Sequence, residues 1–182
     1  MIILASSSPT RAKILKDANI EFIQKPSNFD EESVRANTPK EFVYKATLGK
    51  FSAACKENDY KKHPIVAADT VVTDGVKILR KAKNKEDAKE ILLAQSGASI
   101  TIITCMMIKS KDIQITDIST TNYNFYPFDE KKLNDYLNSD LWQNKAGACM
   151  VEGFCKEFIK SVDGRQSTAM GLHVELIKRF LL

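Results

Sequence analysis

Two periods of apolar spacing alternate along the chain and predict a series of strands and helices. Short apolar runs bounded by turn residues are typical of buried strands. They occur at 1–4, 20–25, 64–72, 99–109, 112–125 and 157–164. Apolar residues three or four positions apart are typical of helices. They occur at 9–18, 38–58, 84–95, 129–137 and 168–180.

The order of these elements predicts an α/β fold in a single domain that spans residues 1–182. Strands and helices alternate without a repeat of fixed period. The two long strands at 99–109 and 112–125 are separated by a turn near Lys111, so we expect them to be antiparallel. The sheet should therefore be mixed rather than fully parallel.

Three helix starts carry capping residues. Ser8 and Thr38 are each followed by proline, which is typical of an N-cap and the first helical position. Glu41 completes a capping box with Thr38, and Asn84 caps the third helix. Within the second helix, Gly49 is small enough to permit close packing against the sheet.

Charge and composition exclude some classes of function without choosing one. The chain has 27 basic and 23 acidic side chains, which give a formal net charge of +4. An excess of this size does not by itself indicate a nucleic-acid partner. The aromatic segment 123–128 contains no Lys or Arg, so we expect it in the core or an interface rather than on a nucleic-acid surface.

No segment predicts a membrane span or a signal peptide. Apolar runs stay well below the roughly 20 residues of a span, and the first residues lack a basic region followed by a cleavage site. Without a span we expect no membrane partner. The four cysteines form no C-x-x-C pair, so we expect free thiols in a reducing cytoplasm. With only His63 and His173, a histidine-rich metal site is not expected.

The first candidate site is SSSPTR at 6–11, between the first strand and the first helix. The N–H groups and dipole of a helix N-terminus favour an anion, and serine hydroxyls add donors. Arg11 could clamp a phosphate with two N–H groups. A plain helix cap beside a solvated arginine explains the same residues equally well. No G-x-x-x-x-G-K-[ST] motif occurs, which disfavours a P-loop enzyme.

The second candidate is Asp69, inside the apolar strand IVAADTVV. A buried carboxylate is costly unless it is paired or bound to metal, so we favour a role in binding a divalent ion or orienting a water over a cap at a strand end. The acidic run 30–32 matters only if its loop faces Asp69, where two carboxylates could share a magnesium ion. Lys45, Lys50 and the pair 80–81 are the basic candidates for contact with a triphosphate.

Three segments in a fixed order suggest a family. They are LASSSPTRAKIL at 4–15, AADTVV at 67–72 and NKAGACMVEG at 144–153. They resemble the A-S-x-S-P-R-R, A-D-T-[IV]-V and D-K-A-G-x-x-x-[IV]-[QE]-G patterns of the Maf family of nucleoside triphosphate pyrophosphatases. The resemblance extends over nearly the whole chain.

The resemblance implies a twisted mixed sheet with two α/β lobes flanking a central cleft, within one domain. It implies hydrolysis between the α- and β-phosphates of a nucleoside triphosphate, which yields a nucleoside monophosphate and diphosphate. A divalent metal is expected, Mg²⁺ first and Mn²⁺ as the second candidate. A homodimer is suggested, with no nucleic acid as partner.

Residue roles follow from the resemblance position by position. Asp69 corresponds to the catalytic aspartate, and Glu31 to an acidic residue that helps with metal or water, so both are candidate metal ligands. The substrate-binding residues implied in the same way are Ser6, Ser8, Arg11, Lys50 and Lys81.

Three further positions bear on the choice of base. The branch described as acting on dTTP and UTP usually has Arg, Thr and Gln where this chain has Thr10, Thr70 and Glu152. The branch described as acting on 7-methyl-GTP has Glu at the last of them, so this chain mixes the two. Glu152 can accept hydrogen bonds from the N–H groups of a purine, which favours a guanine-like base.

A second hypothesis is a non-catalytic nucleotide-binding regulator of cell division, since the family is also associated with division arrest. Asp69, Glu31 and Arg11 are all present, and this argues against an inactive enzyme. The leading hypothesis is therefore a pyrophosphatase that removes noncanonical or surplus nucleotides.

Overall fold

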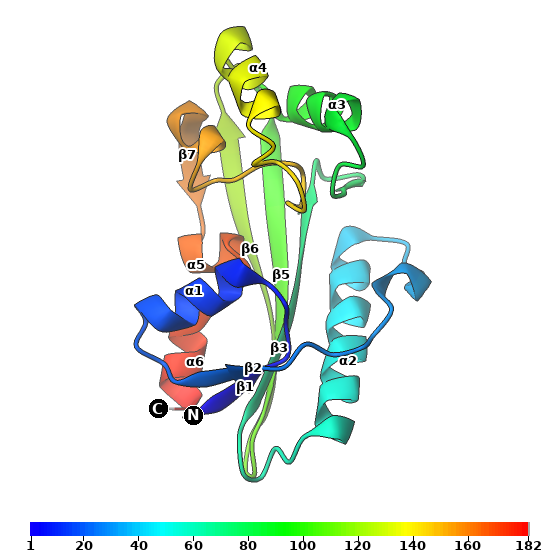
Figure 1. Cartoon of the computed structure of the whole chain (residues 1–182), viewed down its shortest axis with the longest axis vertical. Coiled ribbons are helices and arrows are strands. Elements are labelled where there is room, and N and C mark those ends of the chain that lie inside the picture. Colours follow the sequence, from blue (N-terminus) through cyan, green and yellow to red (C-terminus); the bar gives the residue numbers. More distant parts are fainter. Residues whose placement is uncertain (182) are drawn as a thin grey trace. The chain divides into compact units, whose positions relative to one another are not determined.

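The computed structural model describes residues 1–181 and has the mixed α/β architecture that the sequence predicts (Figure 1). Within these residues, seven strands form one sheet in the order β2-β1-β3-β5-β6-β7, and β4 pairs with β3 off this path. The strands are β1 (Ile2–Leu4), β2 (Phe22–Gln24), β3 (Ile65–Thr73), β4 (Ile78–Leu79), β5 (Ser99–Lys109), β6 (Gln114–Phe125) and β7 (Ile159–Asp163). The α-helices are α1 (Pro9–Asp17), α2 (Pro39–Glu57), α3 (Lys85–Gln95), α4 (Glu130–Asn138), α5 (Gln166–Ala169) and α6 (Val174–Leu181). Two short 3-10 helices are η1 (Glu31–Ser33) and η2 (Phe154–Phe158).

The strand directions confirm a mixed sheet. Strand β1 is parallel to both of its neighbours, with Ile3 opposite Ile23 of β2 and Ile65 of β3. Strand β4 is antiparallel to β3, and β7 is antiparallel to β6. Strands β5 and β6 are neighbours joined by a turn in which the Ser110 N–H donates to the Ile113 carbonyl (2.8 Å). So short a connection can only join antiparallel strands.

The chain divides into two compact units. The first unit comprises residues 1–70, 103–119 and the chain from 165 onward, and the second comprises 71–102 and 120–164. The single domain with two lobes and a cleft stays a prediction, and each unit is described by itself below. None of the helices within residues 1–181 is long and apolar enough to cross a lipid bilayer.

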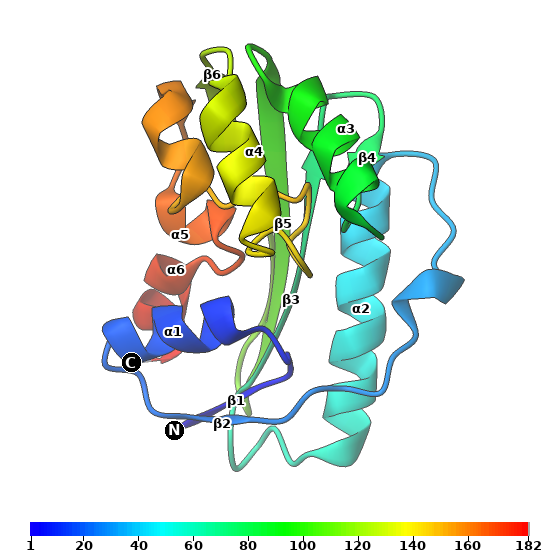
Figure 2. The same ribbon diagram turned by 45° about the horizontal axis from the view of Figure 1, so that its top comes forward.

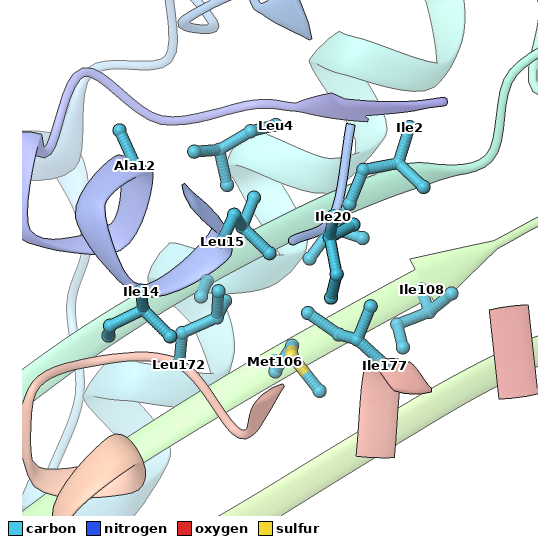
Figure 3. Packing of buried hydrophobic residues seen from close by; sticks show 12 residues of the cluster. Ile2, Leu4, Ala12, Ile14, Leu15, Ile20, Met106, Ile108, Leu172 and Ile177 are labelled. Atoms are coloured by element: carbon cyan, nitrogen blue, oxygen red, sulfur yellow. The ribbon is translucent and has the colours of Figure 1, made fainter. Parts of the chain in front are cut away.

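The core of the first unit lies between the sheet and the helices α1 and α6. Leu4 of β1, Leu15 of α1 and Ile177 of α6 are all completely buried there (Figure 3). Helix α2 covers the other side of strands β3 and β5 (Figures 1 and 2). Each such side chain contributes about 1.5–3 kcal/mol by leaving water, so this core fixes the start of α1 relative to the sheet.

The second unit has its own core beneath α3 and α4, which contact each other (Figure 2). Leu92 and Leu133 are buried in it, together with Trp142. Tyr123 stacks on Phe125, so the aromatic segment lies partly in the core, as one of its two interpretations predicted.

The capping predictions for α1 and α2 are confirmed. The Ser8 hydroxyl accepts the Arg11 N–H (3.3 Å), and the Thr38 hydroxyl accepts the Glu41 N–H (3.1 Å). The Glu41 carboxylate accepts from the N–H of Asn37 (2.8 Å), so the box closes one residue before the cap.

The prediction of one continuous helix over 168–180 is wrong. Helix α5 ends at Ala169 and α6 begins at Val174, and between them Gly171 has a φ of +103°. This backbone conformation is open to glycine and costly for other residues, so it ends the helix. The apolar spacing nevertheless continues across the break, because Leu172 and Ile177 both enter the same core (Figure 3).

The expected packing of Gly49 against the sheet is also wrong. A Cβ added to Gly49 would lie 2.2 Å from the ring of Phe29. Gly49 therefore receives a side chain from the loop that precedes α2. This contact fixes the loop two residues before Glu31.

The expectation of four free thiols is wrong for one pair of cysteines. Cys149 and Cys155 form a disulfide, with their Cα atoms 6.3 Å apart, whereas Cys55 and Cys105 are free. Burial raises the pKa of the Cys105 thiol to about 11, so this thiol stays protonated at neutral pH.

Candidate active site

Arg11 lies in the first turn of α1, and three uncharged oxygens orient its guanidinium. Its Nη1 donates to the Ser6 hydroxyl (3.0 Å), its Nη2 to the Thr70 hydroxyl (2.9 Å) and its Nε to the Gly171 carbonyl (2.7 Å). The residue is only 8% exposed. These three acceptors carry no charge, so they fix the guanidinium without cancelling its positive charge. They use three of its five N–H groups.

The electrostatic surroundings of Arg11 act in two directions. Burial lowers the pKa of the guanidinium below its usual value, and the negative charges of Asp69 and Glu31 oppose that shift. An arginine stays protonated in proteins even so, because its ordinary pKa lies far above neutral pH. Arg11 is therefore a buried cation with two carboxylates within electrostatic range.

The structure gives the two serines of the opening segment different partners, and it buries Arg11, which is therefore not the solvated arginine of the plain-cap interpretation. The Ser8 hydroxyl accepts the Arg11 N–H and serves as the cap of α1. The Ser6 hydroxyl accepts both Arg11 Nη1 (3.0 Å) and the Ser8 N–H (3.2 Å). Since two bonds occupy its lone pairs, the Ser6 hydroxyl is left to act as a donor. The Gln24 side chain fixes this backbone by donating to the Ser6 carbonyl (2.8 Å).

Asp69, Lys50 and Glu31 form a second group of charges. Asp69 is on β3 and is 6% exposed. Lys50 Nζ, from α2, lies 2.6 Å from Asp69 Oδ1 and 2.8 Å from Glu31 Oε1. The loop that carries Glu31 thus faces Asp69, which is the condition under which the acidic run 30–32 was expected to matter. One ammonium group brings the two carboxylates to the same point.

Asp69 and Glu31 are the two carboxylates of this group that could hold a divalent metal ion. Within the described part of the chain there is no group of three or more His, Cys, Asp or Glu side chains that could hold one. Magnesium needs fewer protein ligands, because it commonly binds one or two carboxylates and completes its shell with water and substrate phosphates. Asp69 and Glu31 would supply those carboxylates. The Glu31 side chain is 47% exposed, so water can reach it.

Lys81 belongs to the second unit, where it follows β4 and lies beside the segment NKAG at 144–147. It is exposed, and its backbone forms an isolated bridge with Ala146. The Gly147 N–H donates to the Leu79 carbonyl (3.0 Å), and the Gln95 side chain donates to the Gly147 carbonyl (2.6 Å). Buried Gln95 therefore fixes the loop against the backbone that carries Lys81.

Glu152 also lies in the second unit, beside two tyrosines. Burial raises the pKa of Tyr123, and raises the pKa of Tyr136 to about 12, and in both cases the negative charge of Glu152 adds to the shift. Glu152 is half-buried, so its carboxylate is partly accessible and lies within electrostatic range of both tyrosines. Thr10, the remaining specificity position, is half-buried beside Arg11 in the first unit.

The first unit brings most of the predicted site residues together. Ser6, Thr70 and Arg11 are joined by hydrogen bonds, and Lys50 joins Asp69 to Glu31. Sequence reasoning missed the acceptor Gly171 because the helical pattern ran through it. It also missed two buried threonines, Thr104 and Thr168, whose neighbours carry no recognisable motif.

Comparison with known proteins agrees with this arrangement. The family model described as Maf-like protein matches residues 1–182. A nucleoside triphosphate pyrophosphatase of a Nitratiruptor species is 55% identical over 177 residues, which cover 96% of this chain and 95% of that protein. Proteins of the same name from Helicobacter pylori (strain Shi470) and Campylobacter jejuni subsp. doylei are 42% and 38% identical. The alignments cover 96% of this chain and 91% of the first protein, and all of both chains for the second. The chain therefore belongs to the Maf family.

Proposed function

We propose that this chain is a nucleoside triphosphate pyrophosphatase that cleaves between the α- and β-phosphates and releases a nucleoside monophosphate and diphosphate. Its relatives carry this name over nearly their whole length. The observation that carries the proposal is Arg11, a buried guanidinium whose three acceptors are uncharged. Such a cation gains most from a charged ligand, and phosphate oxygens match its paired N–H groups.

The phosphates would be bound by donors at the start of α1. Arg11 supplies two N–H groups and Ser6 supplies its hydroxyl proton. The positive end of the helix dipole adds to the attraction. Lys50 would bind the phosphates once Asp69 and Glu31 bind the metal ion instead of its ammonium group. We assign Lys81 to the same substrate on the family pattern alone.

Asp69 would orient or deprotonate the attacking water. A buried carboxylate can take this role because it gains a proton as the water attacks phosphorus. Glu31 approaches the same point through Lys50, so the two carboxylates can serve one reacting centre. Phosphoryl transfer depends mainly on positioning and charge stabilisation, and these residues supply both.

Members of this family are generally metal-dependent, and we propose Mg²⁺ as the ion, with Mn²⁺ as a substitute. When bound by Asp69 and Glu31, it would neutralise charge on the phosphates and make water more acidic. Lys50 would have to yield its bonds to both carboxylates as the ion binds.

The base preference stays a proposal that rests on Thr10, Thr70 and Glu152. Glu152 offers a carboxylate beside Tyr123 and Tyr136, which suits the N–H groups of a guanine-like base. A cytoplasmic location, a homodimer, the absence of a nucleic-acid partner and a link to cell division rest on the sequence and the family resemblance. Nothing in the described residues favours the non-catalytic alternative.

The test is a panel of standard and modified nucleoside triphosphates incubated with the protein and Mg²⁺. We expect stoichiometric monophosphate and diphosphate, with the highest kcat/KM for a guanine-like base. Release of inorganic phosphate alone would mean a different scissile bond. No release from any member of the panel would favour the regulator instead.

A further inference from the structure

Three threonines from three elements form a chain of hydrogen bonds that ends at Arg11. Thr70 on β3 accepts from Arg11 Nη2 (2.9 Å). Its hydroxyl lies 2.9 Å from that of Thr104, on the neighbouring strand β5. Thr104 in turn donates to the carbonyl of Thr168 in α5 (2.8 Å). All of these residues belong to the first unit.

The direction of every proton in this chain can be deduced. A hydroxyl has one proton, and a carbonyl can only accept. The proton of Thr104 is therefore used by the Thr168 carbonyl. Between the two hydroxyls, Thr70 must then be the donor and Thr104 the acceptor. The oxygen of Thr70 is thereby turned to accept from Arg11.

We propose that Thr104 is a positioning residue for Arg11 and that it acts through the hydroxyl of Thr70. Thr104 is completely buried, so no solvent competes for its bonds. It fixes the polarity of Thr70, and Thr70 then fixes one edge of the guanidinium. The inference rests on the proposed function only in assigning Arg11 to phosphate.

The geometry leaves Arg11 little freedom once this chain is complete. The Gly171 carbonyl accepts from Arg11 Nε. Because glycine has no Cβ, there is room here for the side chains of Arg11 and Thr70. A Cβ at Gly171 would lie 3.0 Å from the Thr70 hydroxyl and 3.2 Å from Arg11 Nε. Arg11 and Thr70 are thus packed against one glycine and bonded to each other.

The position of Thr70 acquires a defined role from this arrangement. Since its proton is given to Thr104, Thr70 has no donor to offer to a base. It can only accept. Its effect on substrate choice would therefore pass through Arg11 and the phosphates rather than through a hydrogen bond donated to the base.

Replacement of Thr104 by valine tests the relay with almost no change of volume. In Thr104→Val, the Thr70 proton loses its acceptor and must seek another. As the hydroxyl turns, its lone pairs leave Arg11 Nη2, and one charge-assisted bond is lost. In Thr104→Ser the hydroxyl remains, so the relay is retained.

Two measurements report on Arg11 in wild type, Thr104→Val and Thr104→Ser. One is calorimetric binding of diphosphate, and the other is the rate at which phenylglyoxal modifies Arg11, read by mass spectrometry. The loss of a hydrogen bond to a charged group changes an equilibrium constant by about tenfold or more. We expect Thr104→Val to bind diphosphate about tenfold more weakly and to be modified about tenfold faster, with Thr104→Ser close to wild type.

The matched control is Thr47→Val. Thr47 in α2 is equally buried, and its hydroxyl donates to the carbonyls of Val43 (2.7 Å) and of Cys105 (3.3 Å), the residue that follows Thr104 in β5. Thr47→Val makes the same substitution at a hydroxyl that is not hydrogen-bonded to Thr70 or to Arg11. We expect Thr47→Val to lower thermal stability while Arg11 reactivity and diphosphate affinity stay at wild-type values. Equal changes in both valine variants would overturn the proposal, since the effect would then be structural.

A double variant separates a relay from two independent contacts. If Thr104 acts through Thr70, Thr104→Val should cause no further loss in a Thr70→Val background. Additive losses would contradict the relay, as would wild-type behaviour of Thr104→Val. The phenylglyoxal rates stay informative even if the protein releases no diphosphate from any triphosphate. Failure of the proposed function and failure of this inference can therefore be told apart.

Discussion

Two cations of the candidate site in the first unit, Arg11 and Lys50, have opposite surroundings. Arg11 is bound by a serine, a threonine and a backbone carbonyl, all of them uncharged. Lys50 is bound by two carboxylates, those of Asp69 and Glu31. The first cation keeps its charge for a ligand, whereas the second is neutralised by the protein.

The difference indicates how one site can attract both an anion and a cation. Arg11 provides a fixed positive charge that suits phosphate. The group around Lys50 carries one positive and two negative charges, a net charge that suits a metal ion. Substitutions that alter one of the two surroundings at a time test this difference, each against a control of the same chemistry elsewhere in the chain.

The largest effect is expected for Asp69→Asn. The amide cannot take a proton from water and binds a divalent ion poorly, so kcat should fall about a thousandfold. The hydrogen bonds of Arg11 do not involve Asp69, so calorimetric binding of diphosphate should persist. Asp17→Asn removes the same charge from an exposed ion pair and should leave kcat unchanged. Equal turnover by Asp69→Asn would remove Asp69 from the mechanism.

A smaller effect is expected for Arg11→Lys, which retains the charge but loses the planar donor set. An ammonium cannot bond Ser6, Thr70 and Gly171 at once in their present positions. We expect kcat/KM to fall about a hundredfold, the loss of one to two charge-assisted hydrogen bonds. The exposed Arg179 on α6 provides the control, Arg179→Lys. If Arg11→Lys matched it in steady-state kinetics, geometry would not matter at Arg11.

Lys50→Met should sharpen the contrast by changing metal affinity rather than phosphate affinity. Without the ammonium, Asp69 and Glu31 are left as two negative charges at one point. Mn²⁺, measured by electron paramagnetic resonance without nucleotide, should then bind about tenfold more tightly. Lys45→Met removes a lysine of the same helix that pairs with Glu41, and it should not alter Mn²⁺ affinity. Weaker Mn²⁺ binding by Lys50→Met would show that Lys50 does not occupy the ion's position.

The smallest effect concerns the glycine beneath Arg11. Gly171 and Gly75 have similar φ values, +103° and +96°, but nothing lies near a Cβ at Gly75. Gly75→Ala therefore reports backbone strain alone, about 1 kcal/mol in the free energy of unfolding, and Gly171→Ala should cost about twice that. Only Gly171→Ala should also weaken diphosphate binding, because its Cβ approaches Thr70. Identical results in denaturant unfolding and calorimetry would mean that the close approach is unimportant.

Much of the fold was predictable because it depends on local sequence. The cap at Ser8, the box at Thr38 and the long apolar strands act within a few residues. The break at Gly171 was not predictable in this way. Leu172 and Ile177 keep the helical spacing on both sides of it, and the glycine's carbonyl is turned to a residue 160 positions away in the chain.

For the candidate site too, motifs identified residues, whereas contacts between distant segments could not be predicted. Arg11, Asp69 and Glu31 were found from motifs, and a carboxylate within an apolar strand was itself a signal. The sequence predicted that Ser8 caps the helix, but it could not tell that the Ser6 hydroxyl accepts two hydrogen bonds and is left as a donor. That distinction depends on which hydroxyl meets the guanidinium.

By itself, the sequence determined the family, the mixed α/β class and the identity of the charged residues, since these follow from motifs and short-range periodicity. Only the tertiary structure decided what surrounds each charge. It placed Lys50 between two carboxylates, seated Phe29 on Gly49, and joined Arg11 to Thr104 through Thr70. The physical reason is that the free energy of a charge depends on its neighbours within a few ångströms, and in this chain those neighbours come from distant segments.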